Sequence, residues 1–581
     1  METRSAQPAS PTTMHQQAMA WYRAATLTER LTSWPPRVTF SPSTEDECDA
    51  EAAKTLELWK AQRPFTAHTL FADRLQMDTM SEQDLLALLA EPPESLQDRL
   101  GYPTPPDWVT ALSNALETSP ASHSDLPRES IFARFAILDP LYPLLQNSIA
   151  RLQTAIDALV QEHSLLPFDP HTILAPLLSN LMQRVSLIVN KTLVLELHIA
   201  RLRGRLQGET PQERFQYYLH SLSQREYLLP LLEEYSILAR QLLISGQFWA
   251  ENSIAFLQHL CADWQEILTA FAPVQEPGML TQAVGGAGDT HRGGQSVMIL
   301  TFASGWKLVY KPRKLAVDAH FQELLGWLNA QGATPPLRIL KLITKESYGW
   351  TEFITQRDCV SEDEVRRFYE RQGEYLALFY LLEATDLHFE NVLAAGEHPL
   401  LVDLEALLHP RHSPDDQTTR LATQTLGHSV LHVGLLPWRI MADEKNEGVD
   451  IGGLIKRKGQ ISARPVPQWE ERWTDEMRLV RKKIKMGASQ NCPHLQGQEV
   501  RPFDYIESLV TGFTTLYRLL LAKQDELRTT WLPRFAHDEV RFIARNTHLY
   551  GVLLSESLHP NLMRDSLKRE RFLDYLWLDV E

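Results

Sequence analysis

The stretch from Asp386 to Glu405 reads DLHFENVLAAGEHPLLVDLE and combines a polar loop with an apolar strand. Asp386 and Asn391 lie five residues apart on the predicted loop, and Asp403 follows an apolar run that is typical of a buried strand. A carboxylate and an amide oxygen delivered from adjacent elements are hard oxygen ligands of the kind that suits Mg²⁺. The stretch therefore predicts a metal-dependent site built on a loop and a strand end.

Upstream of this stretch, the sequence predicts a β-hairpin preceded by a glycine-rich segment. Two β-rich runs, 296–302 and 306–311, are separated by a short turn, and glycines cluster over 285–294. Glycine lets the backbone approach a phosphate closely, and Lys311 has the charge and reach to bind one. A helix predicted over 361–384 separates the hairpin from the polar loop.

The order of these features carries more weight than any one of them. Protein kinases show the same order of features: a glycine-rich loop, a strand lysine, a helix, a polar loop and a strand-end aspartate. Taken singly, Lys311 is more often a solvated strand end, a polar loop is more often locally capped, and Asp403 could simply cap a helix. The chain keeps the spacing from Asp386 to Asn391 but has neither H-R-D nor D-F-G here, which argues against an ordinary protein kinase.

The overall composition excludes several classes of function. The 581 residues include 57 Lys and Arg against 73 Asp and Glu, and the formal net charge of −16 disfavours an obligate nucleic-acid binder. The four cysteines, Cys48, Cys261, Cys359 and Cys492, form no CxxC pair, so neither a disulfide scaffold nor a zinc site is expected. No apolar run reaches the ~20 residues of a membrane span, and no secretory signal is found, so we expect a cytoplasmic protein without a membrane segment.

Periodicity and composition divide the chain into five segments and predict a predominantly α-helical α+β fold. The expected segments are a disordered leader over 1–14, a helical region over 15–275, a small lobe with the glycine-rich hairpin over 276–360, a larger lobe over 361–530 and a helical segment over 531–581. The helical region is where a binding groove for a peptide would be sought.

Several motifs together resemble the dehydratase domain of class II lanthipeptide synthetases (LanM). They are Gly288-Asp289-Thr290-His291, Lys307-Leu308-Val309-Tyr310-Lys311-Pro312-Arg313, the loop 386–391, Leu401-Val402-Asp403-Leu404-Glu405 and Ser429-Val430-Leu431-His432-Val433-Gly434-Leu435-Leu436-Pro437. The resemblance implies a lipid-kinase-like, two-lobed core decorated with additional helices. It also implies two reactions on a ribosomal precursor peptide made of a leader and a core. Ser or Thr is phosphorylated by ATP, and the phosphate is then eliminated to give dehydroalanine or dehydrobutyrine.

The resemblance also assigns roles in phosphorylation. Lys311 would bind the ATP phosphates, and Asn391 and Asp403 would hold Mg²⁺. Asp386 would orient or deprotonate the substrate hydroxyl, with His388 beside it.

Three further residues belong to this set. Asp289 and His291 match the family's D-T-H motif and would assist phosphoryl transfer. Glu405 is close enough in sequence to help the metal, and a structural role for it is about equally expected.

Elimination needs a base for the α-proton and cations for the departing phosphate. In the family an Arg and a Thr six residues apart serve this step, and Arg541 and Thr547 match that spacing, with Arg545 between them. Arg suits phosphate because its planar fork donates two hydrogen bonds, although without the resemblance these residues would read as a helix surface. The α-proton base stays open among Lys311, Asp386 and His388.

Other functions remain open at this point. A peptide kinase without elimination is the nearest alternative, followed by a non-catalytic nucleotide- or peptide-binding scaffold and by a small-molecule or lipid kinase. The absence of an evident basic amphipathic helix disfavours a lipid substrate. Complete family members continue into a zinc cyclase with a Cys-His-Gly motif, which is not found up to Glu581. We therefore expect either part of a larger synthetase or an enzyme that leaves ring closure to a separate cyclase.

Overall fold

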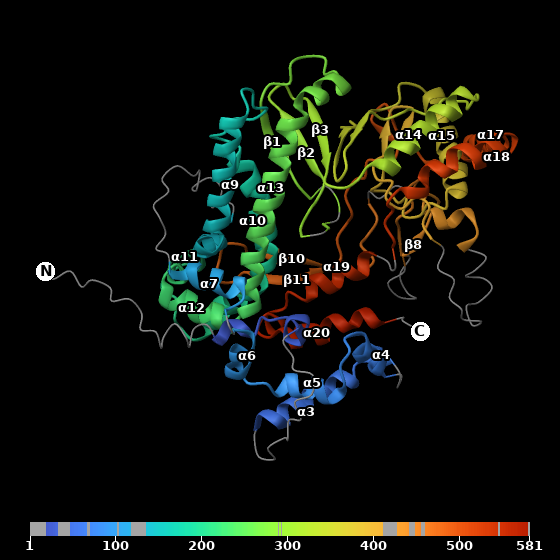
Figure 1. Ribbon diagram of the computed structural model, residues 1–581. Coiled ribbons are helices and arrows are strands. Elements are labelled where there is room, and N and C mark those ends of the chain that lie inside the picture. Colours follow the sequence, from blue (N-terminus) through green and yellow to red (C-terminus); the bar gives the residue numbers. More distant parts are fainter. Residues whose placement is uncertain are drawn as a thin grey trace.

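The protein is a predominantly helical α+β structure in which a small sheet lies between a helical half and a second, larger lobe (Figure 1). The computed structural model describes residues 19–32, 47–66, 70–101, 104–117, 135–286, 288, 290–291, 293–410, 427–440, 448–454, 459–543 and 547–578. The predicted leader, 1–14, lies outside this range. The predicted fold class is confirmed, and across the described ranges every helix is too short or too polar to span a bilayer.

The N-terminal half is helical, as the spacing of its apolar residues predicts. Its helices are α2 (Leu27–Thr32), α3 (Glu47–Lys60), α4 (Leu70–Met77), α5 (Glu82–Ala90), α6 (Pro93–Leu100), α7 (Asp107–Glu117), α9 (Tyr142–Glu162), α10 (Leu174–Leu202), α11 (Pro211–Leu222), α12 (Arg225–Glu234) and α13 (Ser236–Phe271). Helix α5 begins with a capping box between Ser81 and Asp84. The long helices α10 and α13 bury one stripe each in a shared core.

The sheet has five antiparallel strands in the order β1-β2-β3-β5-β4. Their bounds are β1 (Leu280–Val284), β2 (Met298–Phe302), β3 (Lys307–Lys311), β4 (Leu342–Thr344) and β5 (Gly349–Glu352). Strands β2 and β3 form the predicted hairpin, with Ile299 opposite Val309. Because side chains alternate along a strand, Leu308 and Tyr310 join the core shared with α10 and α13, whereas Val309 and Lys311 face the larger lobe.

A buried carboxylate on α13 anchors the sheet. Asp263 accepts hydrogen bonds from Trp350 Nε1 at 2.8 Å and from the Tyr348 hydroxyl at 2.9 Å. Its other oxygen lies 2.8 Å from Lys345 Nζ. One turn earlier on the helix, His259 stacks on Tyr348 with ring centroids 3.5 Å apart. These contacts fix the orientation of the sheet on the helical half.

The larger lobe is built around three helices and a short hairpin. They are α14 (Ala316–Ala330), α15 (Glu362–Leu381), α17 (Ile506–Ala522), β6 (Val392–Ala395) and β7 (His398–Leu401). Ser361 caps α15 by accepting a hydrogen bond from the Glu364 backbone nitrogen, as predicted. Helices α15 and α17 can approach closely because Gly373 has no side chain. A Cβ at this position would lie 2.0 Å from the Leu509 carbonyl oxygen.

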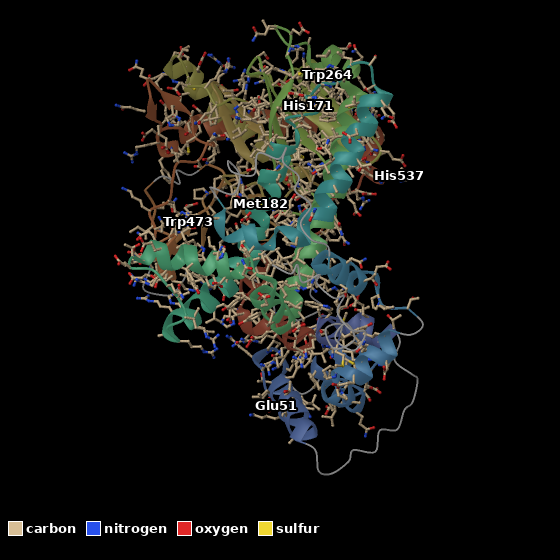
Figure 2. All side chains as sticks on the ribbon, turned by 90° about the vertical axis from the view of Figure 1, so that its left-hand side faces the viewer. Glu51, His171, Met182, Trp264, Trp473 and His537 are labelled. Atoms are coloured by element: carbon tan, nitrogen blue, oxygen red, sulfur yellow. The ribbon has the colours of Figure 1, made fainter. Side chains whose placement is uncertain are left out.

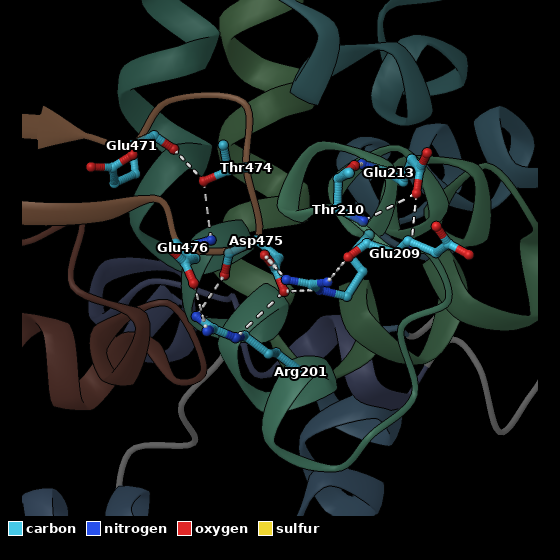
Figure 3. A network of polar contacts seen from close by, with 9 residues as sticks. Arg201, Glu209, Thr210, Glu213, Glu471, Thr474, Asp475 and Glu476 are labelled. Atoms are coloured by element: carbon cyan, nitrogen blue, oxygen red, sulfur yellow. Dashed lines mark hydrogen bonds and ion pairs between the residues drawn. The ribbon is translucent and has the colours of Figure 1, made fainter.

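A hairpin of the larger lobe reaches back to the helical half. Strands β10 (Val466–Glu470) and β11 (Arg478–Lys482) were not predicted as a pair, and their loop carries the fully buried Asp475. Arg214 donates to both oxygens of this carboxylate at 2.6 and 3.2 Å, and Arg201 lies 3.4 Å from it (Figure 3). These ion pairs share the buried carboxylate of Asp475 and tie the two halves together.

Helix α20 and the residues after it pack against helices from the beginning of the described chain. Helix α20 (Ser566–Leu573) packs on the N-terminal helices through Leu567, and the following Asp574 accepts from Trp59 Nε1 at 2.7 Å and Arg74 Nε at 2.8 Å. In the view turned by 90°, Glu51 marks this lower end of the molecule and Trp264 the sheet end (Figure 2).

Replacing Asp263 by Ala is expected to lower the free energy of unfolding by about 2–4 kcal/mol, because the buried Trp350 and the partly buried Tyr348 lose their acceptor. Glu266 is the matched control. It contacts the same Lys345 at 2.7 Å but is half exposed, so Glu266→Ala should cost about 0.5 kcal/mol or less. Urea unfolding followed by tryptophan fluorescence measures both changes. Equal losses in the two variants would show that Asp263 does not anchor the sheet.

Glu374 should give the stability of the protein a distinct pH dependence. It is fully buried in α15, and burial raises its pKa to about 8, with only partial opposition from Arg371. An acid whose pKa is raised in the folded state favours folding below its ordinary pKa, 4.5, and this stabilisation is lost as the pH rises toward about 8. Glu374→Gln should therefore raise the melting temperature more at about pH 8 than at about pH 5.

The control for this prediction is Glu507→Gln on the exposed side of α17, which should shift the melting temperature equally at both pH values. A gain in the Glu374 variant that is the same at both pH values would contradict the assignment.

Candidate functional site

A cavity of about 910 Å³ lies between the sheet and the larger lobe. Eight of the residues singled out in the sequence line it: His291, Lys311, Asp386, His388, Asn391, Asp403, Glu405 and Arg541. Asp289 and Arg545 lie outside the described residues, as does the side chain of Thr547, the first residue of α19 (Thr547–Glu556). The structure therefore brings together residues that are up to 250 positions apart in the chain.

Lys311 reaches the cavity because it ends β3 on the face opposite the core. It is only 6% exposed, and its Nζ donates to the Val402 carbonyl oxygen at 2.5 Å. The same nitrogen lies 3.6 Å from Asp318 Oδ1 on α14. The lysine thus connects the end of β3 to the segment that follows β7.

Two residues that were given no role in the sequence analysis, Arg313 and Asp318, complete this charged cluster. Arg313 donates to both Asp318 oxygens, at 2.7 and 3.3 Å, and to Asp403 Oδ1 at 3.0 Å. Burial alone would raise the pKa of Asp318, but Arg313 and Lys311 outweigh it and hold the pKa below its ordinary value. The spacing of an Asp five residues after Arg313, at a helix start, was the available signal for this pair.

The loop from Asp386 to Asn391 is held by its own hydrogen bonds. Asp386 has a left-handed backbone conformation, with φ of +64°, which Asp tolerates better than most residues. Asn391 Nδ2 donates to the Asp386 carbonyl oxygen at 2.8 Å, and the Val402 nitrogen donates to the Asn391 carbonyl oxygen at 3.1 Å. Because the amide nitrogen of Asn391 is used within the loop, its amide oxygen is the atom left for a cation.

Asp386 and His388 form a close pair. His388 Nε2 lies 3.6 Å from Asp386 Oδ1, and His388 Nδ1 accepts from the Glu390 backbone nitrogen at 3.2 Å. In a neutral ring this places the proton on Nε2, which faces the carboxylate. Burial raises the pKa of Asp386, and the attraction of His388 and Arg541 offsets this only in part.

The motif over 429–437 supports this loop from behind. The Leu387 nitrogen donates to the Val433 carbonyl oxygen at 3.1 Å, within the short helix η3 (Val430–Val433). Gly453 packs on the other side, where a Cβ would lie 2.6 Å from the Leu387 carbonyl oxygen. The two peptide groups around Leu387 are therefore clamped between backbone segments.

Arg541 is held at the cavity by Glu405. Its backbone nitrogen donates to the Glu405 carbonyl oxygen at 2.6 Å, and its Nη1 donates to Glu405 Oε1 at 2.5 Å. Glu405 was expected either to help the metal or to have a structural role. In the described structure its side chain contacts Arg541. This places the guanidinium beside the loop that carries Asp386.

The glycine-rich loop between β1 and β2 is attached to the helical half. Asn180 on α10 donates to the Ala283 carbonyl oxygen at 2.8 Å and accepts from the Gly285 nitrogen at 3.1 Å. Gly294 has φ of +88°, a left-handed backbone conformation that favours glycine, and the guanidinium of Arg184 lies against it. The helical half therefore sets the position of the loop over the cavity.

The fold and the cavity define a two-lobed, predominantly helical α+β protein in which charged residues of both lobes converge on one cleft. Residues 235–581 match the family model described as "Domain of unknown function (DUF4135)", and the chain belongs to this family. A curated relative, "Lacticin 481/lactococcin biosynthesis protein LcnDR2" of Lactococcus lactis subsp. lactis, is 23% identical over 409 residues, which cover 67% of this chain and 43% of the relative. The chain thus spans less than half of that relative. The resemblance inferred from the motifs is confirmed.

Gly453→Ala is expected to displace the loop, because the added methyl group would collide with the Leu387 carbonyl oxygen. Hydrogen–deuterium exchange of the amides over 385–391 should accelerate about tenfold or more. Gly487→Ala is the matched control, since nothing lies within 4 Å of a Cβ at that position. Unchanged exchange in the Gly453 variant would mean that this clamp does not hold the loop.

Proposed function

We propose that the chain is a lanthipeptide dehydratase that uses ATP and Mg²⁺ to phosphorylate Ser and Thr of a precursor peptide and then eliminates the phosphate. The observation that carries the proposal is the convergence of these eight residues, from both lobes, on one cavity. The printed name of the relative, a lacticin 481/lactococcin biosynthesis protein, supports the same pathway. The expected partners are a precursor peptide and a cyclase, and the expected location is the cytoplasm.

The cavity has the size and the lining that a nucleotide needs. Its volume of about 910 Å³ lies within the range of small-molecule sites. Apolar side chains that include Leu340, Ile354 and Leu393 form a wall suited to a base, whereas Lys311 and the glycine-rich loop are suited to phosphates. The lining thus combines an apolar cluster with charged and glycine-rich parts, as the base and the phosphates of ATP require.

The residues expected to hold the metal fit Mg²⁺ by their chemistry. Asp403 supplies a carboxylate and Asn391 an amide oxygen, both hard ligands, and phosphate oxygens and water would complete the shell. Within the described residues no three His, Cys, Asp or Glu side chains gather as a protein-only metal cluster. When bound, the metal would neutralise charge on the transferring phosphate.

Asp386 is the proposed base for the substrate hydroxyl. Its raised pKa makes it a stronger proton acceptor than an exposed Asp, and His388 Nε2 lies 3.6 Å from its carboxylate. The hydroxyl oxygen attacks the γ-phosphorus as its proton passes to Asp386, and ADP leaves. Lys311 would balance the charge of the phosphates on the opposite side of the cavity.

Elimination would use the same cavity. A base removes the α-proton of the phosphorylated residue, the electron pair forms the Cα–Cβ double bond, and the Cβ–O bond to phosphate breaks. Arg541 would bind the departing phosphate through its fork while Glu405 holds it in place. Lys311, Asp386 and His388 all line this cavity and remain the three candidates for the α-proton base.

The decisive experiment is mass spectrometry of a precursor peptide encoded beside this chain, after incubation with ATP and Mg²⁺. The intact protein should remove one water per modified Ser or Thr. Arg541→Gln should slow elimination about 10²–10³-fold, so that phosphopeptide accumulates, because one donor to the leaving phosphate is lost. Asp386→Asn should give neither product.

Arg534→Gln serves as the control, because Arg534 pairs with Glu323 outside the cavity and should leave both steps unchanged. Phosphopeptide as the final product of the intact protein would reject the elimination step. No ATP-dependent change of mass would reject the whole proposal.

A further inference from the structure

Arg313, which follows β3, connects two carboxylates that lie on separate elements. Its guanidinium donates to both oxygens of Asp318, at 2.7 and 3.3 Å, and to Asp403 Oδ1 at 3.0 Å. Asp318 lies on the helix after β3, whereas Asp403 follows β7 in the larger lobe. The side chain of Arg313 therefore bridges the end of β3 and the segment proposed to bind the metal.

The contact orients the Asp403 carboxylate. Oδ1 accepts from Arg313 Nη2 and from the Glu405 backbone nitrogen, the latter at 3.3 Å. Two donors on one oxygen restrict rotation of the carboxylate and direct the second oxygen, Oδ2, away from them. Hydrogen bonds of this kind to a ligating carboxylate are the usual means by which a protein fixes the geometry of a metal site.

The other end of Arg313 is held firmly. Asp318 is only 4% exposed, accepts both hydrogen bonds of the fork and also lies 3.6 Å from Lys311 Nζ. The Arg313 guanidinium is always charged, and it lies within hydrogen-bond distance of both carboxylates. A lysine at this position could contact one carboxylate as a point charge but could not form the fork.

We propose that Arg313 is a positioning residue that holds Asp403 in the orientation required for a divalent cation, and that Asp318 is its anchor. The inference rests on the proposed function, since it takes Asp403 as a metal ligand. It adds a role that neither Lys311 nor Asn391 supplies, because Lys311 contacts the Val402 carbonyl oxygen and Asn391 is oriented by the Asp386 loop.

The test measures metal binding rather than turnover. Mn²⁺ serves as a spectroscopic probe in place of Mg²⁺, and its binding is followed by electron paramagnetic resonance on the full chain with a non-hydrolysable ATP analogue. Arg313→Gln should weaken Mn²⁺ binding about 10–100-fold, the usual cost of losing a hydrogen bond behind a ligand. Arg313→Lys should weaken it less, and binding of the analogue in the presence of EDTA should change little in either variant.

Two variants keep the result interpretable. Asp318→Asn, which removes the anchor's charge and leaves Asp403 intact, should weaken Mn²⁺ binding in the same direction. Arg534→Gln, an arginine paired outside the cavity, should match the wild-type protein. Circular dichroism and the melting temperature establish whether each variant is folded. If Arg313→Gln is unstable, Arg313→Lys tests the same contact because it keeps the positive charge.

The outcomes separate this inference from the proposed function. Unchanged Mn²⁺ binding in folded Arg313→Gln, with normal binding by the wild-type protein, would overturn the role of Arg313 alone. Tighter Mn²⁺ binding in that variant would also overturn it, because Arg313 would then compete with the metal for Asp403. No Mn²⁺ binding by the wild-type protein with the ATP analogue would overturn both this inference and the metal-dependent function.

Discussion

The cavity depends on the ion pairs that the buried carboxylate of Asp318 forms with Lys311 and Arg313. Lys311 and Arg313 are two cations that leave the same strand end and point to the same side, and without a counter-charge their burial and mutual repulsion would be costly. Asp318 neutralises part of this charge from the first turn of α14. The two cations can then contact Val402 and Asp403, and the position of the larger lobe follows from that of β3.

The helical half determines where β3 itself lies. A small antiparallel sheet has two faces, and one of them must be covered by another element to be stable. Here α10 and α13 cover the face with Leu308 and Tyr310, and Asp263 fixes the sheet through Trp350. The opposite face is then free to line the cavity. The long N-terminal region is thus part of the site's architecture, since it also positions the glycine-rich loop through Asn180.

Local patterns in the sequence predicted the elements around the site but not the contacts between them. The hairpin of β2 and β3, the cap at Ser361 and the loop over 386–391 each follow from signals a few residues long. The contact of Arg313 with Asp403 and the docking of Asp475 on Arg214 do not, because an ion pair between residues far apart in the chain leaves no periodicity in either segment. The boundaries proposed along the chain, at 275, 360 and 530, remain predictions for the same reason. Contacts such as those of Asp574 with Trp59 and Arg74 join the last segment to the first helices.

The net charge of −16 conceals a cavity that contains both signs in close balance. Lys311, Arg313 and Arg541 are each paired with a carboxylate, so the cavity is not a basic cleft that would attract any polyanion. An incoming phosphate must instead compete with Asp318 or Glu405 for its cation, which favours a ligand that brings its own metal ion. The same balance of charges suits two successive reactions on one residue. The carboxylates can accept protons, and the guanidinium groups, held by ion pairs, can donate hydrogen bonds to phosphate. On the proposed function, the phosphorylated side chain would meet both without leaving the cavity.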